Sequence, residues 1–114
     1  MKIVESIAVI TEVPEPIRDA ESIMDTILSL KYETGVSAFA FSKACFDEMF
    51  FRLSSGLAGE IIQKFVNYDI RAAVFGDFSG YTSKPLRDFI YESNKGHHFG
   101  FLPTEDQAVE WLKR

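Results

Sequence analysis

Short apolar segments alternate along the chain with stretches of helical period, and this alternation predicts strands and helices in turn. Four segments have the length and composition of strands: residues 7–10, 36–41, 70–76 and 99–102. The third is apolar on both faces, which is typical of a central strand. Residues 1–4 can add an edge strand ahead of the first segment, although no turn signal separates the two.

Apolar residues recur at the spacing of one helix face between and after these strands. The first helix is predicted to begin behind Asp19 as its N-cap and to end at Gly35. A short helix is expected over residues 46–53, and the clearest amphipathic stripe covers residues 57–66. The pattern leaves open whether residues 54–56 break this helix or are carried through it.

Two further helices have start signals of their own. Ser83 precedes a helix with Pro85 in its first turn, and residues 94–96 close it. Thr104 opens a capping box that begins the last helix. Strand–helix alternation repeated four times favours an α/β fold with right-handed crossovers. We expect one domain over residues 1–114, with a single-layer, mostly parallel sheet of four to five strands flanked by about four helices. The strand order does not follow from the pattern.

Composition and charge narrow the class of protein. The chain has 114 residues, 17 acidic against 12 basic side chains and a net charge of −5, which disfavours nucleic acid as a partner. One cysteine cannot form an internal disulfide. No apolar run approaches the ~20 residues of a membrane span, and no secretory signal is evident. We therefore expect a cytoplasmic protein with no membrane span.

Aromatic residues are abundant, with 11 phenylalanines, four tyrosines and one tryptophan. Large aromatic side chains predict an aromatic core. Two alternatives stay open, namely a pocket for an apolar ligand and a partner surface, which includes a homodimer formed through exposed aromatics. The pocket would be lined by Phe50, Phe51, Phe78 and Tyr81.

Polar side chains follow the strands at their carboxyl ends, where sites collect in open α/β sheets. The longest such loop, residues 76–82, leads into a helix N-terminus that can receive an anion. The candidate residues for a ligand or partner are Asp77, Ser79, Tyr81, Ser83, Lys84 and Arg87. In the plainer interpretation, Asp77 and Ser79 close the turn and cap the helix. Arg87 and Tyr91 share a helix face, which is either solvated or a surface for self-association or a partner.

Enzymatic chemistry has no positive support in the sequence. His97 and His98 precede the last strand, at the opposite edge from the candidate serines, so no catalytic triad can form. Adjacent strand residues also point to opposite faces, so we expect one histidine half-buried, one solvated and no metal site. Cys45 is expected to be a buried, inert thiol. An enzyme with Asp77 as base is the weaker alternative, and no cofactor is expected.

The segment Leu53-Ser54-Ser55-Gly56-Leu57 resembles STAS domains, the small β/α domains of anti-sigma-factor antagonists and sulfate transporters. The resemblance implies that Ser54 is a phosphoacceptor, with Ser55 as its neighbour and cap and Gly56 completing the site. Antagonists commonly carry an aspartate before the two serines, whereas this chain has Leu53.

A second resemblance covers nearly the whole chain. Residues 31–35, 56–68, 76–79, 81–84 and 86–94 are similar, in the same order, to a bacterial family catalogued as domain of unknown function 4180. This resemblance implies no activity and no catalytic residues.

The leading hypothesis is a non-enzymatic regulatory or protein-interaction domain with an unknown protein partner. Its candidate surface joins the helix start at residues 54–56 to the loop at residues 77–83. A small-molecule binding domain for an apolar or anionic ligand is the alternative.

Overall fold

Five strands form one mixed sheet in the order β1-β2-β3-β4-β5. The computed structural model describes residues 1–52 and 55–114, and the side chains of residues 1–52 and 60–114. The strands are β1 (Lys2–Val4), β2 (Ile7–Ile10), β3 (Ala38–Ser42), β4 (Arg71–Phe75) and β5 (Phe99–Leu102). β1 pairs antiparallel with β2, and the other three pairings are parallel. The predicted α/β class with a mostly parallel sheet is confirmed, and β4 lies between β3 and β5 as a central strand.

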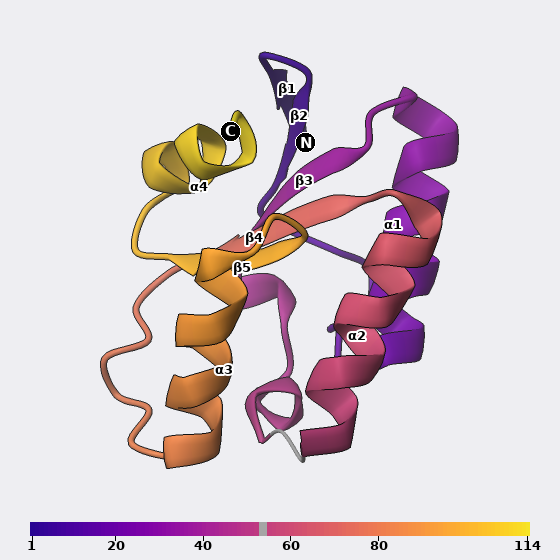
Figure 1. Cartoon of the computed structure of the whole chain (residues 1–114). Coiled ribbons are helices and arrows are strands. Elements are labelled where there is room, and N and C mark those ends of the chain that lie inside the picture. The colour runs from indigo at the N-terminus through magenta and orange to yellow at the C-terminus, as the bar shows by residue number, and fades with distance from the viewer. Residues whose placement is uncertain (53–54) are drawn as a thin grey trace.

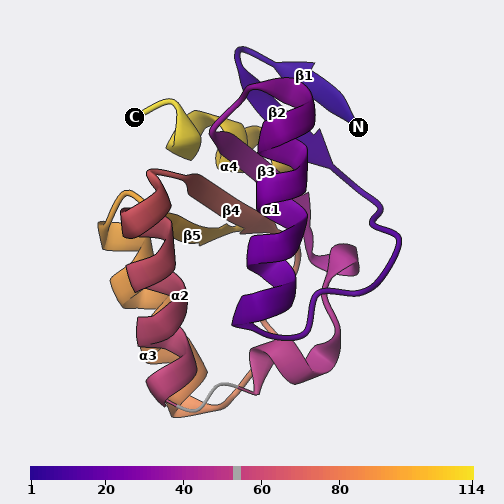
Figure 2. The same ribbon diagram turned by 90° about the vertical axis from the view of Figure 1, so that its right-hand side faces the viewer.

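In the described residues, four α-helices flank the sheet, and two short 3₁₀ turns follow β3. They are α1 (Ala20–Thr34), η1 (Lys43–Cys45), η2 (Glu48–Phe51), α2 (Ser55–Tyr68), α3 (Lys84–Lys95) and α4 (Glu105–Leu112). Since β2 to β5 are neighbours in chain order, crossovers of one hand place their connecting helices on one face. Figures 1 and 2 show α1, α2 and α3 on that face and α4 on the other.

The two faces of the sheet carry residues of different size. Phe39, Phe41, Phe99 and Phe101 point towards the three helices and are almost fully buried. On the opposite face a row of small residues crosses the sheet, where Ala40 pairs with Ala73 and Ala73 with Gly100. This row lets α4 approach closely. A Cβ on Gly100 would lie 2.9 Å from Cζ2 of Trp111.

Most of the predicted caps are present. The Asp19 side chain accepts from Ser22 N at 2.9 Å, and Gly35 ends α1 in the left-handed region at φ 76°. Thr104 accepts from Gln107 N at 3.2 Å at the start of α4. Ser83 stands at the N-cap of α3 but makes no capping hydrogen bond with its side chain.

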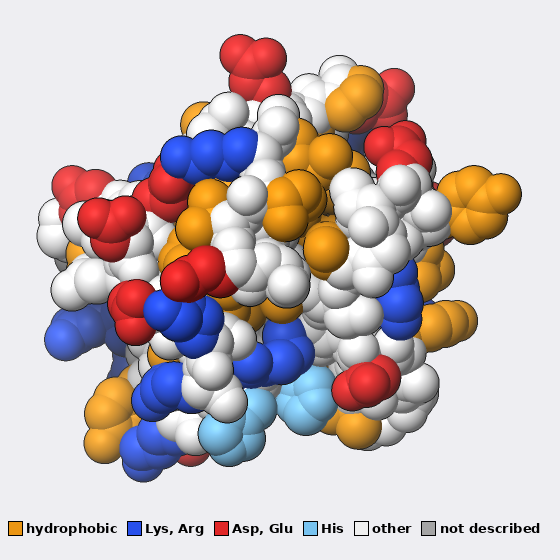
Figure 3. Space-filling view, turned by 90° about the horizontal axis from the view of Figure 1, so that it is seen from above, with side chains coloured by type: hydrophobic (Ala, Val, Ile, Leu, Met, Phe, Trp, Pro, Cys, Tyr) orange, Lys and Arg blue, Asp and Glu red, His pale blue; other side chains and the backbone are white. Residues whose placement is uncertain are grey.

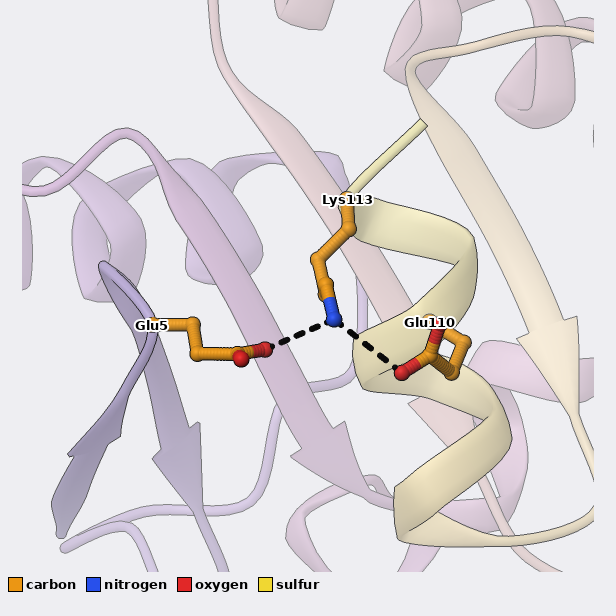
Figure 4. A network of polar contacts seen from close by, with 3 residues as sticks. All are labelled: Glu5, Glu110 and Lys113. Atoms are coloured by element: carbon orange, nitrogen blue, oxygen red, sulfur yellow. Dashed lines mark hydrogen bonds and ion pairs between the residues drawn. The ribbon is translucent and has the colours of Figure 1, made fainter.

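The N-terminal edge strand β1 is joined to β2 by a tight turn that the sequence pattern did not predict. Glu5 and Ser6 connect β1 to β2 with φ angles of 51° and 69°, the left-handed values that primed hairpin turns require. Neither residue is a glycine or an asparagine, so the turn has no sequence signature. Lys113, the C-cap of α4, contacts this turn: its ammonium lies 2.9 Å from the carboxylate of Glu5 and 3.2 Å from that of Glu110 (Figure 4).

The structure corrects two predictions on the helices. In place of the short helix expected over residues 46–53, the described residues 46–52 hold the single 3₁₀ turn η2, which buries Phe51 and leaves Met49 62% exposed; Leu53 lies outside the described residues. The stripe over residues 57–66 does lie in α2, but Val66 is 48% exposed at the helix surface. Within the described part of the chain, no helix has the length and apolarity that crossing a membrane requires.

Candidate functional site

The carboxyl ends of β3 and β4 bring Lys43 beside the loop that follows β4. These strands are neighbours, with Ser42 opposite Phe75, so the chain leaves both at the same edge. The Lys43 ammonium donates to the carbonyl oxygen of Asp77 at 3.0 Å and lies 4.6 Å from the ring centroid of Tyr81. Gly76 permits this approach, because a Cβ there would lie 2.7 Å from Cβ of Lys43.

Asp77 organises the loop through its carboxylate. Its Oδ1 accepts from the backbone N–H of Ser79 at 2.9 Å and from the Ser79 hydroxyl at 2.6 Å. These bonds to Ser79 hold the pKa of Asp77 below its ordinary value. An exposed carboxylate with a lowered pKa is a weak base, so this environment does not favour Asp77 as a general base.

Tyr81 joins the loop to η2. Its hydroxyl donates to the carboxylate of Glu48, with distances of 2.9 and 3.0 Å to the two oxygens. Its ring packs against Phe51 and Phe78, with centroids 5.3 and 6.2 Å away. Partial burial raises the pKa of the Tyr81 hydroxyl. The loop is therefore anchored from η1 by Lys43 and from η2 by Glu48.

A groove of about 540 Å³ opens between this loop and α3, and we call it the carboxyl-edge groove. Its lining combines aromatic rings with polar groups: Phe78, Ser79, Tyr81, Thr82, Arg87, Ile90, Tyr91 and Asn94. Arg87 and Tyr91 also line a second hollow, which continues along α3 past Lys84 and Asp88. The prediction that Arg87 and Tyr91 share a helix face is confirmed.

The cations around this groove differ in how they are engaged. Lys43 bonds to Asp77 and lies over aromatic rings, and Lys84 pairs with Asp88 at 2.6 Å. The guanidinium of Arg87 is exposed and has no hydrogen bond or ion pair to any residue that the structure describes. Of these three cations, Arg87 is the one whose charge is not engaged by a described residue.

The predicted site residues divide into those that line the groove or the adjoining hollow, those beside it, and those at the start of α2. Ser79, Tyr81 and Arg87 line the carboxyl-edge groove, with Lys84 in the adjoining hollow. Asp77 supports the loop without lining the groove, and Ser83 is exposed at the start of α3. Ser54 lies outside the described residues. Ser55 and Gly56 belong to the first turn of α2, which begins at the same end of the molecule as α3 (Figure 1).

The aromatic pocket suggested by the sequence is divided between the core and this groove. Phe50 and Phe51 are buried in the core, at 0% and 4% exposure, whereas Phe78 and Tyr81 line the groove. The sequence pattern did not identify Glu48 as part of the site, because its partner Tyr81 lies 33 residues further along the chain.

The histidines lie at the opposite edge of the sheet, and the cysteine lies buried in η1, directly after β3. His97 is exposed and His98 half-buried, which confirms the prediction of one of each. Figure 3 views the molecule from the end at which α2 and α3 finish, and both histidines lie there. Among the residues described, no three His, Cys, Asp or Glu side chains are grouped to hold a metal ion. Cys45 is buried, and burial raises the pKa of its thiol to about 11.

Three comparisons with known proteins complete this description. A family model described as "Domain of unknown function (DUF4180)" matches residues 4–112. No curated protein and no solved structure matches the chain.

Proposed function

This chain belongs to the DUF4180 family, and we propose that it is a non-enzymatic protein-interaction domain whose carboxyl-edge groove binds an acidic segment of a partner protein. The observation that carries the proposal is the exposed guanidinium of Arg87, without a partner among the described residues and shared by two adjoining hollows. A guanidinium binds carboxylate or phosphate oxygens through two parallel hydrogen bonds. The neighbouring cations Lys43 and Lys84 are already engaged, so the anion would dock at Arg87.

The shape of the groove supports a protein segment over an enclosed small molecule. Small-molecule sites bury roughly 70–90% of their ligand. This groove is open to solvent and continues past Arg87 along α3, and Tyr91 on its wall is 63% exposed. Arginine and tyrosine are also, with tryptophan, the side chains enriched among the residues that contribute most to binding at protein interfaces. An extended acidic segment would fit along this track.

The proposal needs no catalytic group. Asp77 is held in its ionised form by Ser79, and the Tyr81 hydroxyl donates to Glu48, so both are engaged in shaping the loop. The role of Ser54 as a phosphoacceptor stays a prediction. The mass of the intact protein from its natural host, with any phosphoryl group located by fragmentation, tests that prediction separately.

Site-specific crosslinking in cells of the natural host tests the proposed function. The photoreactive residue p-benzoylphenylalanine replaces Tyr91 at the groove, and in a matched control it replaces Tyr32, which is 94% exposed on α1. We expect a protein adduct from position 91 and none of the same mass from position 32. Equal adducts from both positions, or none from position 91, would contradict the proposal. A small molecule that stays bound in a native mass spectrum and is lost with Arg87→Gln would replace it with a ligand-binding function.

A further inference from the structure

A second pocket lies at the opposite edge of the sheet, between α2 and α3, and we call it the amino-edge pocket. Its volume is about 410 Å³, and it is lined by Ile62, Gln63, Phe89, Glu92, Ser93, Gly96, His98 and Phe99. None of these residues belongs to the carboxyl-edge groove. A pocket of this size accommodates a molecule of one or two rings.

One polar group in this pocket is left unsatisfied. Ser93 lies in the last turn of α3 and is only 7% exposed. Its Oγ is buried and has no hydrogen-bond partner among the residues that the structure describes. Buried hydroxyls are normally paired with protein or water, and a helical serine can donate to the carbonyl four residues earlier. In its present orientation Oγ is closed off from the pocket, so a ligand would reach it through rotation of the Ser93 side chain about its Cα–Cβ bond.

The remaining lining determines the chemistry of the ligand. The aromatic rings of Phe89 and Phe99 lie 6.1 Å apart, centroid to centroid, and Ile62 adds a partly buried aliphatic side chain. Such walls favour a flat apolar body. Among the described residues no lysine or arginine lines the pocket, and the Glu92 carboxylate lies 3.8 Å from the Lys95 ammonium at the surface. An anionic ligand would therefore find no counter-charge in the lining.

We propose that the amino-edge pocket binds a small uncharged aromatic molecule, through a hydroxyl or carbonyl group that forms a hydrogen bond with Ser93 Oγ. The pocket and the buried hydroxyl together carry this inference. It does not rest on the proposed protein-interaction function, because the two sites share no lining residue.

Phenol and toluene are suitable probes, because they have nearly the same shape and only phenol carries a hydroxyl group. Each is titrated into the full chain while amide resonances are followed by NMR. We expect phenol to shift the amides of Ile62, Ser93 and Phe99 and to bind at least about tenfold more tightly than toluene. Ser93→Ala should lower the affinity for phenol to that for toluene. Ser29→Ala, an exposed serine on α1, is the matched control and should leave both affinities unchanged.

Three results would overturn the inference: no shifts at these amides, equal affinities for the two probes, or full phenol affinity in a folded Ser93→Ala variant. The amide spectrum of each variant reports on its fold in the same experiment. Arg87→Gln separates the two proposals, because it should reduce the adduct from position 91 roughly tenfold or more and leave phenol binding intact.

Discussion

The side-chain amide of Asn94 forms two hydrogen bonds with the backbone of Phe101. Its Nδ2 donates to the Phe101 carbonyl at 3.0 Å, and its Oδ1 accepts from the Phe101 N–H at 2.7 Å. Because β5 is an edge strand, this amide satisfies groups that a further strand would otherwise pair. Trp111 adds a bond from its Nε1 to the Asn94 carbonyl at 3.3 Å, so Asn94 connects α3, β5 and α4.

Asn94→Ala should therefore destabilise the protein more than an ordinary helix substitution. It removes two hydrogen bonds and leaves partly buried backbone groups of Phe101 unpaired, which costs about 2 kcal/mol of unfolding free energy. Asn67→Ala on α2 is the control, because Asn67 is exposed and its side chain bonds to Gln63. Urea unfolding measures both variants. A cost for Asn94→Ala no larger than that of the control would refute the edge-pairing role.

Gly100→Ala tests the close contact between β5 and α4. The added Cβ would lie 2.9 Å from the Trp111 ring, so we expect a loss of about 1–3 kcal/mol in unfolding free energy. Gly80→Ala is the matched control, since no atom lies within 4 Å of a Cβ there. In a double-mutant cycle with Trp111→Phe, the smaller ring should recover part of the loss. If the changes in unfolding free energy were strictly additive, the contact between residue 100 and Trp111 would not cause the loss of stability.

Ser93→Ala should raise the stability of the unliganded protein. Removing a buried hydroxyl that lacks a partner relieves a desolvation cost of about 1–3 kcal/mol. Ser29→Ala gains helix propensity alone, so the gain of Ser93→Ala beyond this control is the quantity to measure by urea unfolding. A net loss relative to Ser29→Ala would show that the hydroxyl is satisfied in solution.

The buried thiol of Cys45 should make the free energy of unfolding depend on pH in the alkaline range. Burial raises the pKa of its thiol from 9.0 to about 11, so the folded state favours the neutral form. This contribution is fully present below pH 9 and is lost as pH rises towards about 11, by roughly 2 kcal/mol. The unfolding free energy of Cys45→Ala should fall less steeply over this interval than that of the parent chain. The same pH dependence in Cys45→Ala and the parent chain would contradict the raised pKa of Cys45.

The pattern of the chain was enough to predict most of the fold. Strand–helix alternation gave the class, and local hydrogen-bonding chemistry located the caps at Asp19, Gly35 and Thr104. The β1–β2 turn was not predictable, because Glu5 and Ser6 adopt left-handed angles without the residues that favour them. Strand order also lacked a local signal, since it depends on which strands pair rather than on any one segment.

The candidate site was predictable only in part. The rule that sites collect at the carboxyl ends of strands located the loop with Ser79 and Tyr81, and helical spacing joined Arg87 to Tyr91. The sequence pattern placed Asn94 only among the residues that close the helix, and it held no sign of the half-buried contact with Phe101. Periodicity does not report contacts between distant elements.

The most direct test of the proposed function is the effect of Arg87→Gln on the adduct formed from position 91. The same substitution at Arg18, an exposed arginine before α1, is the matched control. Hydrogen bonds to charged groups contribute about 1.5–3 kcal/mol, so Arg87→Gln should reduce the adduct roughly tenfold or more, while Arg18→Gln leaves it unchanged. An adduct of equal yield in both variants would mean that Arg87 does not hold the partner and that the proposed binding mode is wrong.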